Sequence, residues 1–290
     1  MAGNPDVTRY AYYLLRKAAV GDRLPTPIDD IVACADLAVS RDVTLNQKSK
    51  ELSLQFPLRL RAAIRKVVGL VDLREDIIYL DYQTLPQKRN FVTLHEVGHK
   101  ALPWQRQTYL YVDDDISLDL EICEQFEQEA NQFAADVLFQ MGRFAEDARS
   151  LPFAITSPVT LARRYGASAH AAIRRYVEQS ERACAVLTVR RQPEKNEREF
   201  IPQARGKVQS TMFTKRFGEV AWNRYISTSA SLLASILYPH RFPQGDLVID
   251  DVDGRHTEFS FEVFTNSYDT FVFVYPCYEK AQSIWPLFTS

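Results

Sequence analysis

The chain has 290 residues, of which 46% are hydrophobic, 25% charged and 12% aromatic. This composition is typical of a globular protein, so it excludes a disordered or collagen-like chain. The 35 Lys and Arg residues against 37 Asp and Glu leave a net charge of −2, which excludes a globally basic nucleic-acid binder but not a local basic patch.

Neither a membrane-spanning helix nor a secretory signal is predicted. The sequence contains no apolar run of about the length that a spanning helix needs. The N-terminal segment lacks a basic start, and Arg16 and Lys17 interrupt its apolar stretch. The four cysteines lie far apart and form no C-x-x-C pair. We therefore expect a cytoplasmic protein with free thiols.

The N-terminal half is predicted to be mainly helical, with one β-hairpin. Apolar residues at helical spacing predict the helices, and two β-rich runs around the polar turn 74–76 predict the hairpin. Thr84, with Gln87 three residues on, gives one helix a capping box, and Pro103 is expected to end that helix. The expected helices span 5–20, 28–37, 58–69, 86–101 and 121–141, and the hairpin strands span 70–73 and 77–80.

The character of the chain changes at about residue 184. Before this point, helices at 157–165 and 169–177 flank the turn Gly166-Ala167-Ser168. After it, β-branched and aromatic residues predominate, so strands are expected together with one long helix. The expected strands span 185–189, 246–249, 258–263 and 271–275, and the helix spans 220–238. The sequence therefore predicts a second, α+β domain.

The motif H-E-x-x-H occurs at 95–99, inside the helix expected at 86–101. Residues four apart lie one turn apart on the same helix face, so His95 and His99 can both reach one zinc ion at about 2.0–2.1 Å. Glu96 lies beside that face, where it can hold the water at the metal and take its proton. Gly98 is expected to let another element approach the helix closely. The motif thus predicts a metal site with Glu96 as its catalytic residue.

A catalytic zinc needs a third protein ligand and an open fourth position. The helix expected at 121–141 carries several glutamates, and their helical positions separate them. Glu127 shares a face with Ala130 at the border of the apolar stripe, whereas Glu129 belongs to a polar, solvent-like face. Glu127 is therefore the preferred ligand, and an exposed helix carboxylate is the alternative. Asn131, one turn later, can hold the far nitrogen of a zinc-bound histidine.

Two further features of this site stay open at the level of the sequence. Tyr109, Tyr111, His170 and Tyr176 are candidates for a group that donates a hydrogen bond to the oxyanion. Cys123 could occupy the open metal position as a thiolate and hold the site inactive, or it could be a small buried hydrophobe.

Two separated blocks resemble the ImmA/IrrE family of metallopeptidases. They are Lys88-Arg89-Asn90-Phe91-Val92-Thr93-Leu94 leading into the H-E-x-x-H motif, and Glu127-Gln128-Glu129-Ala130-Asn131-Gln132-Phe133-Ala134-Ala135. The resemblance covers about residues 5–140, and its E-x-x-x-N block also places the third ligand at Glu127. It implies a gluzincin-like α+β peptidase with one zinc ion per chain. It also implies a protein substrate, a helix-turn-helix repressor whose cleavage releases transcription.

The rest of the chain is similar to the longer, IrrE-like branch of that family. Residues 161–176 are similar to its helix-turn-helix, and residues 183–290 fit its GAF-like sensor domain in size and α+β character. The same layout occurs in CapP-like peptidases, which control anti-phage systems together with a repressor. The resemblance implies a peptidase domain at 1–150, a helix-turn-helix-like segment at 151–182 and a GAF-like domain at 183–290.

Arginines concentrate in the segment that follows the peptidase part. In such relatives a DNA-damage signal, such as single-stranded DNA, is thought to activate cleavage. Cations that track phosphates and aromatic side chains that stack on bases would serve that purpose. A solvated helix face with core aromatics is the alternative. The candidate DNA-binding residues are Arg163, Arg164, Arg174, Arg175, Arg190 and Arg191, and the interleaved aromatic residues are Tyr165, Tyr176, Phe200, Phe213, Phe217 and Trp222.

Two functions are compatible with these observations. The first is a zinc endopeptidase, in which His95, His99 and Glu127 hold the metal and Glu96 moves the proton. The second is a non-enzymatic DNA-binding regulator with a vestigial metal site, which predicts salt-dependent DNA binding and no proteolysis. The intact H-E-x-x-H motif favours the peptidase, because a structural site has no need of Glu96.

Overall fold

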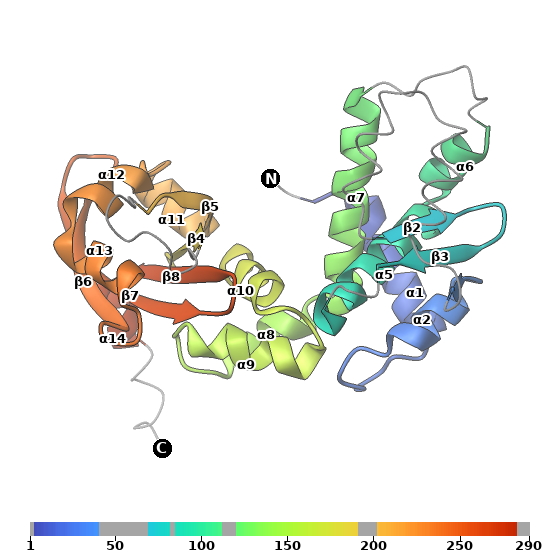
Figure 1. The fold of residues 1–290 in the computed structure, drawn as a ribbon, viewed down its shortest axis with the longest axis horizontal. Coiled ribbons are helices and arrows are strands. Elements are labelled where there is room, and N and C mark those ends of the chain that lie inside the picture. The colour runs from blue at the N-terminus through green and yellow to red at the C-terminus, as the bar shows by residue number, and fades with distance from the viewer. Residues whose placement is uncertain (1–2, 41–68, 82–84, 112–119, 191–201, 283–290) are drawn as a thin grey trace. The chain divides into compact units, whose positions relative to one another are not determined.

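The computed structural model describes residues 3–40, 69–81, 85–111, 120–190 and 202–282 (Figure 1). The chain divides into two compact units, the first comprising Met1–Phe144 with Arg163–Ser168 and the second comprising Ala145–Ala162 with Ala169–Ser290. Helices and sheets occur in both units, which confirms the predicted α+β class. The helix expected at 58–69 falls outside the described residues except for Gly69, which is in a strand.

The first unit contains helices and a small sheet. Its helices are α1 (Pro5–Lys17), α2 (Ile28–Cys34), α5 (Pro86–Ala101), α6 (Pro103–Tyr111) and α7 (Leu120–Leu138). Its strands are β1 (Ala38–Val39), β2 (Gly69–Asp72) and β3 (Ile77–Leu80). They lie in the order β1-β3-β2, with β1 parallel and β2 antiparallel to β3. The predicted hairpin and the predicted helices that fall on described residues are thus present.

Helix α5 spans the residues that the sequence predicts, but its ends differ in chemistry from the prediction. Its N-cap is Leu85, no side chain caps it, and Pro86 occupies its first turn. The N-cap is thus one residue later than the expected Thr84, and Thr84 itself lies outside the described residues. Pro103 does follow the end of α5, yet it also begins α6, because proline suits the first turn of a helix.

Helices α5 and α7 pack closely against each other. Leu94 and Val97 of α5 and Phe133 of α7 are fully buried. A Cβ atom at Gly98 would lie 3.2 Å from Cδ1 of Phe133 and 3.3 Å from Cα of Ala130, which is tighter than ordinary packing. The absence of a side chain at Gly98 therefore allows the close approach that the sequence predicts.

The small sheet packs on the other side of α5. A Cβ atom at Gly69 in β2 would lie 2.4 Å from Cγ1 of Val92 and 3.1 Å from Oε1 of Glu96. Near the end of the helix, Lys100 forms an ion pair with Asp76 in the hairpin turn. These contacts hold α5 between α7 and the hairpin, so the helix that carries the H-E-x-x-H motif is fixed on two sides.

The second unit is built on a five-stranded antiparallel sheet in the order β5-β4-β8-β7-β6. Its strands are β4 (Ala185–Arg190), β5 (Ala204–Gln209), β6 (Gln244–Asp250), β7 (His256–Thr265) and β8 (Asp269–Pro276). Its helices are α10 (Ala169–Glu178), α11 (Thr211–Phe217), α12 (Trp222–Thr228), α13 (Ala230–Leu237) and α14 (Cys277–Gln282). The chain passes from one unit to the other within α8 (Arg143–Arg149), within α9 (Thr156–Tyr165) and again just before α10.

Both faces of the sheet are covered, as the side chains of β8 show. Successive side chains of a strand point to opposite faces of the sheet. Val272 and Val274 join the core formed with α11, α12 and α13. Phe273 points to the other face, where its ring lies 5.9 Å from that of Tyr176 in α10. The apolar side of α10 is thus buried against the sheet of its own unit.

The segment that the sequence predicts to resemble a helix-turn-helix contains the two expected helices and the turn between them. Helix α9 ends at Tyr165, Gly166 adopts a positive φ of 70°, and α10 begins at Ala169. Tyr165 packs against Phe139 and Phe144 in the first unit, with ring centroids 6.1 and 5.4 Å away. A DNA-binding role for this segment, and the division at residues 150 and 182, stay predictions.

Several elements of the second unit differ from the prediction. The helix expected at 220–238 is two helices, α12 and α13, because Ser229 adopts an extended conformation and its hydroxyl caps α13 by accepting from Leu232 N–H. The predicted strands at 185–189, 246–249, 258–263 and 271–275 are present. In this unit the sequence did not predict β5, α11 and α14. It also did not predict β1 and α6 in the first unit, or α8 at the boundary between the units. The GAF-like identity of this unit stays a prediction.

Two properties expected from composition can be compared with the structure. None of the helices in the described part of the chain is both long and apolar enough to cross a bilayer. The four cysteines form no disulfide bond, as their spacing predicts.

Candidate metal centre

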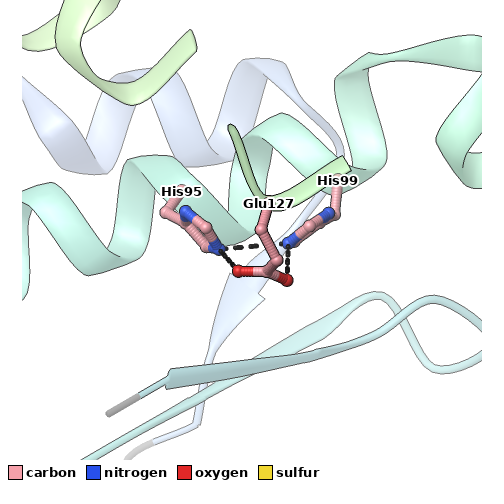
Figure 2. Close-up of side chains that lie close together, drawn as sticks. All are labelled: His95, His99 and Glu127. Atoms are coloured by element: carbon pink, nitrogen blue, oxygen red, sulfur yellow. Dashed lines mark hydrogen bonds and ion pairs between the residues drawn. The ribbon is translucent and has the colours of Figure 1, made fainter. Parts of the chain in front are cut away.

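The side chains of His95, His99 and Glu127 converge between α5 and α7 (Figure 2). The two Nε2 atoms lie 3.1 Å apart. Oε2 of Glu127 lies 3.3 Å from Nε2 of His95, and Oε1 of Glu127 lies 3.5 Å from Nε2 of His99. The structure therefore brings together the three residues that the sequence proposes as metal ligands.

The chemistry of this group fits a tetrahedral cation. Ligand atoms held at about 2.0–2.1 Å from one tetrahedral zinc ion lie about 3.3–3.4 Å from one another, close to the separations found here. The side chain of Glu127 is 57% exposed, so solvent reaches the three converging side chains next to this carboxylate. Such a group can hold a metal ion and leave a coordination position accessible, unlike a closed structural site.

Hydrogen bonds hold both imidazoles by their far nitrogens. Nδ1 of His95 lies 3.2 Å from Oδ1 of Asn131, which is the contact that the sequence predicts. Nδ1 of His99 lies 2.8 Å from Oε1 of Gln105 in α6. Because amide oxygens only accept, both Nδ1 atoms donate, so in the neutral imidazoles Nε2 is the nitrogen without a proton. Metal-binding histidines commonly have this arrangement.

Gln105 and Glu129 are polar residues of this site that the sequence did not identify. Gln105 is fully buried, and its Nε2 donates to Oε2 of Glu129 at 2.8 Å. Glu129 is itself only 5% exposed, so the solvent-like face assigned to it from the sequence is wrong. The polar residues of that face meet polar groups of α1: for example, Thr8 donates to Asp136 at 3.0 Å. A polar helix face can thus be buried against another polar surface.

Glu96 lies next to the proposed ligands and is buried. Burial raises the pKa of its carboxyl above the ordinary value, although the nearby His99 and His95 act in the opposite direction. A hydrogen bond from the backbone of Val71 in β2 also reaches Glu96. The hairpin therefore helps to place the acid that the motif predicts as catalytic.

One of the four candidate oxyanion donors lies at this site. The ring of Tyr109 in α6 lies 5.7 Å from that of His99, edge to face. Tyr109 is 37% exposed, and the partial burial of its phenol, with the nearby carboxylates of Glu127 and Glu96, raises the pKa of the phenol, so it stays protonated. His170 and Tyr176 belong to the second unit, and the side chain of Tyr111 is outside the described residues.

Cys123 lies one helical turn before Glu127 and is half-buried. The metal-ligand group found among the described residues consists of His95, His99 and Glu127, without Cys123. A blocking role for Cys123 thus stays a hypothesis from the sequence.

The proposed ligands influence one another's protonation in the metal-free protein. Hydrogen bonds from His95 and His99 hold the pKa of Glu127 well below its usual range. Burial disfavours a charged His99, but the hydrogen bond to Glu127 and the negative charges of Glu96 and Glu127 outweigh it, so the pKa of His99 is raised. A proton on His99 therefore competes with a metal ion at and above its ordinary titration range.

This competition predicts how zinc affinity depends on pH. Below the raised pKa of His99 the imidazole is protonated and zinc must displace the proton; above it no proton is displaced. We expect the zinc dissociation constant to fall about tenfold per pH unit as the pH rises from about 6 to 7. Isothermal titration in buffers of different ionisation enthalpy measures the affinity and the released proton. Zinc affinity that does not vary with pH in this interval would contradict the assignment.

The six candidate DNA-binding arginines are divided between the two units, apart from one that lies outside the described residues. Arg163 and Arg164 belong to the first unit, Arg174, Arg175 and Arg190 belong to the second, and Arg191 is outside the described residues. Nε of Arg174 lies 2.7 Å from Oε1 of Glu178, which partly neutralises it.

The described aromatic residues that alternate with these arginines are unsuited to stack on bases. Five of the six are described, and all five are buried: Tyr165, Tyr176, Phe213, Phe217 and Trp222. They are core residues, as the alternative interpretation proposed, so support for the DNA interface rests on the exposed arginines alone.

A histidine pair on α5 and a glutamate from α7 define the site as one suited to a mononuclear metal hydrolase. Residues 58–176 match the model of the IrrE N-terminal-like domain family, Peptidase_M78. The matched segment contains the H-E-x-x-H motif, Gln105 and Glu127. This match supports the resemblance to the ImmA/IrrE family and indicates a metallopeptidase.

Solved structures with similar folds include a Mycobacterium tuberculosis transcriptional regulator. It is 14% identical, with a TM-score of 0.55, and the alignment covers 99% of this chain and 94% of that chain. At this identity the similarity shows the fold alone. No curated protein sequence matches the chain significantly.

Proposed function

We propose that the chain is a zinc-dependent endopeptidase with its centre at His95, His99 and Glu127. The observation that carries this proposal is the convergence of two imidazole Nε2 atoms and one carboxylate within 4.8 Å, beside the buried acid Glu96. The family match over residues 58–176 supports the same class of reaction. When bound, zinc would polarise the scissile carbonyl and acidify the attacking water.

Glu96 would transfer the proton in this reaction. Because burial raises its pKa, its carboxylate can accept a proton from the attacking water near neutral pH more readily than an exposed glutamate can. The protonated carboxyl then gives that proton to the leaving amine, which restores the carboxylate and completes cleavage of the peptide bond.

Tyr109 is our candidate for the donor to the carbonyl oxygen of the substrate. Its ring contacts His99, and its raised pKa keeps the phenolic proton in place. A protonated phenol at the edge of the centre can donate a hydrogen bond to the oxygen that becomes negative as water attacks.

We further propose that the substrate is a helix-turn-helix repressor and that its cleavage releases stress-response or anti-phage genes. The resemblance to the ImmA/IrrE family supports this substrate, and the family match supports the peptidase domain. Activation by single-stranded DNA belongs to the same proposal. Its support is limited to exposed arginines, which include Arg163 and Arg190.

Metal removal tests the peptidase directly. The purified chain is incubated with a helix-turn-helix protein encoded beside its gene, with and without single-stranded DNA, and the fragments are identified by mass spectrometry. We expect cleavage to stop when a chelator removes the metal and to return when one equivalent of zinc is added, because zinc is required for the reaction.

Cleavage by protein that elemental analysis shows to be metal-free would contradict the zinc mechanism. A metal-loaded chain that binds DNA with a steep salt dependence, yet cleaves neither the repressor nor a peptide library, would favour the non-enzymatic regulator instead.

A further inference from the structure

The amide of Gln105 is held in one orientation by groups at both ends. Its Nε2 donates to the backbone oxygen of Phe126 at 3.1 Å and to Oε2 of Glu129 at 2.8 Å. Its Oε1 lies 2.8 Å from Nδ1 of His99. Both acceptors on the nitrogen side lack a proton to give, so a flipped amide would place oxygen against oxygen. The amide oxygen of Gln105 must therefore face His99.

This orientation determines which nitrogen of His99 carries the proton. An amide oxygen can only accept, so Nδ1 of His99 must be the donor in this contact. In the neutral imidazole, Nε2 is then unprotonated and has its lone pair toward Glu127, 3.5 Å away. This tautomer is the one that can bind a metal ion through Nε2.

The carboxylate of Glu129 is itself firmly placed. It accepts hydrogen bonds from Trp104 Nε1 at 2.7 Å, Gln105 Nε2 at 2.8 Å, Gln125 Nε2 at 3.0 Å and Asn4 Nδ2 at 3.0 Å. These donors come from α6, from α7 and from the residue that caps α1. A buried carboxylate with several donors is a rigid anchor, and charge-assisted hydrogen bonds are the stronger kind.

The geometry points to Glu129 as a positioning residue of the metal centre. Acting through Gln105, it holds His99 in the tautomer and ring orientation that leave Nε2 available to the metal. This inference rests on the proposed function, because its effect is exerted on the zinc-binding ability of His99. Glu129 would touch neither metal nor substrate.

The partner of the other histidine is held less firmly. His95 contacts Asn131, which is exposed, at 3.2 Å. His99 has a shorter contact to a buried amide that is fixed by a buried carboxylate. His99 is therefore the pre-organised ligand of the pair, and Glu129 is the charged group that makes it so.

Zinc affinity of the metal-free protein, measured by competition with a chromophoric chelator, tests the inference. We expect Glu129→Gln and Gln105→Ala each to weaken zinc binding about tenfold or more. Because the two residues act in series, the double variant should bind zinc about as weakly as Gln105→Ala alone. Glu124→Gln changes an exposed carboxylate of the same helix and should bind zinc like the wild type.

A second readout separates positioning from simple destabilisation. The nitrogen-15 chemical shifts of the His99 imidazole report its tautomer in the zinc-free protein, above the pKa of the ring. We expect the Nδ1–H form in the wild type and a growing share of the Nε2–H form in Glu129→Gln. A purely structural role would lower the melting temperature but leave the tautomer unchanged.

A variant that exchanges Gln105 and Glu129 tests whether the original arrangement can be restored. It also provides the test if Glu129→Gln alone does not fold. Gln105→Glu combined with Glu129→Gln again places an acceptor against Nδ1 of His99, so the Nδ1–H tautomer and most of the zinc affinity should return.

A wild type that binds no zinc would refute the proposed function. A wild type that binds zinc, with unchanged affinity and tautomer in Glu129→Gln, would overturn this inference alone. In the exchange variant, weak binding with the Nε2–H tautomer would also overturn it.

Discussion

Replacing Glu96 by Gln is expected to lower kcat for repressor cleavage by about 10²–10⁴-fold, the usual contribution of a positioned general base. The amide has nearly the same shape, but it cannot accept the proton of the attacking water. Because Glu96 is not one of the three converging ligands, zinc content should stay at one per chain. Initial rates with metal-loaded protein, followed by mass spectrometry of the fragments, measure the effect.

The matched control for this experiment is Glu124→Gln, which makes the same chemical change at an exposed position of α7. It should cleave at the wild-type rate. If Glu96→Gln and the wild type cleave equally fast with equal zinc content, Glu96 is not the base. If Glu96→Gln loses its zinc, the loss of activity says nothing specific about proton transfer, and the residue instead supports the metal site.

The second large effect is expected at Glu127, the proposed ligand on α7. Glu127→Ala removes the only carboxylate of the converging group. Loss of one protein ligand should remove roughly 3–5 kcal/mol of metal-binding free energy, which corresponds to about 10²–10⁴-fold weaker zinc binding. Equilibrium competition with a chelator measures this change, and peptidase activity at limiting zinc should fall in parallel.

Glu124→Ala is the control for this prediction, because it shortens another glutamate of the same helix that is not part of the group. Wild-type zinc affinity in Glu127→Ala would assign the third ligand elsewhere. Recovery of activity in Glu127→Ala at high zinc concentration would separate weak binding from a damaged fold, since a misfolded protein does not recover.

The three converging side chains could be predicted from the sequence because the relevant geometry is local. His95 and His99 lie one turn apart on any straight helix, and Glu127 lies at the border of an apolar stripe that must pack inward. Gly98 likewise predicts a close helix contact, which the structure shows. These features depend on spacing within one element, and spacing is visible in the chain.

The buried polar groups could not be predicted in the same way. Glu129 has polar helical neighbours, which normally indicate solvent. It is buried because Trp104 and Asn4, 25 and 125 residues away in sequence, supply its hydrogen bonds. Only the tertiary fold brings such partners together. Strand β5 could not be predicted for a related reason. None of its residues is buried, so it lacks the apolar alternation that indicates a strand.

The turn between α9 and α10 has a practical consequence for dissecting the chain. Tyr165 is buried against Phe139 and Phe144, and the carbonyl of Gly166 accepts a hydrogen bond from Asn90, near the start of the motif helix. A fragment truncated at residue 150 would lose the side chain of Tyr165, which would expose the rings of Phe139 and Phe144 to water. An isolated fragment of the first unit should therefore extend at least to Ser168, so that these side chains stay covered.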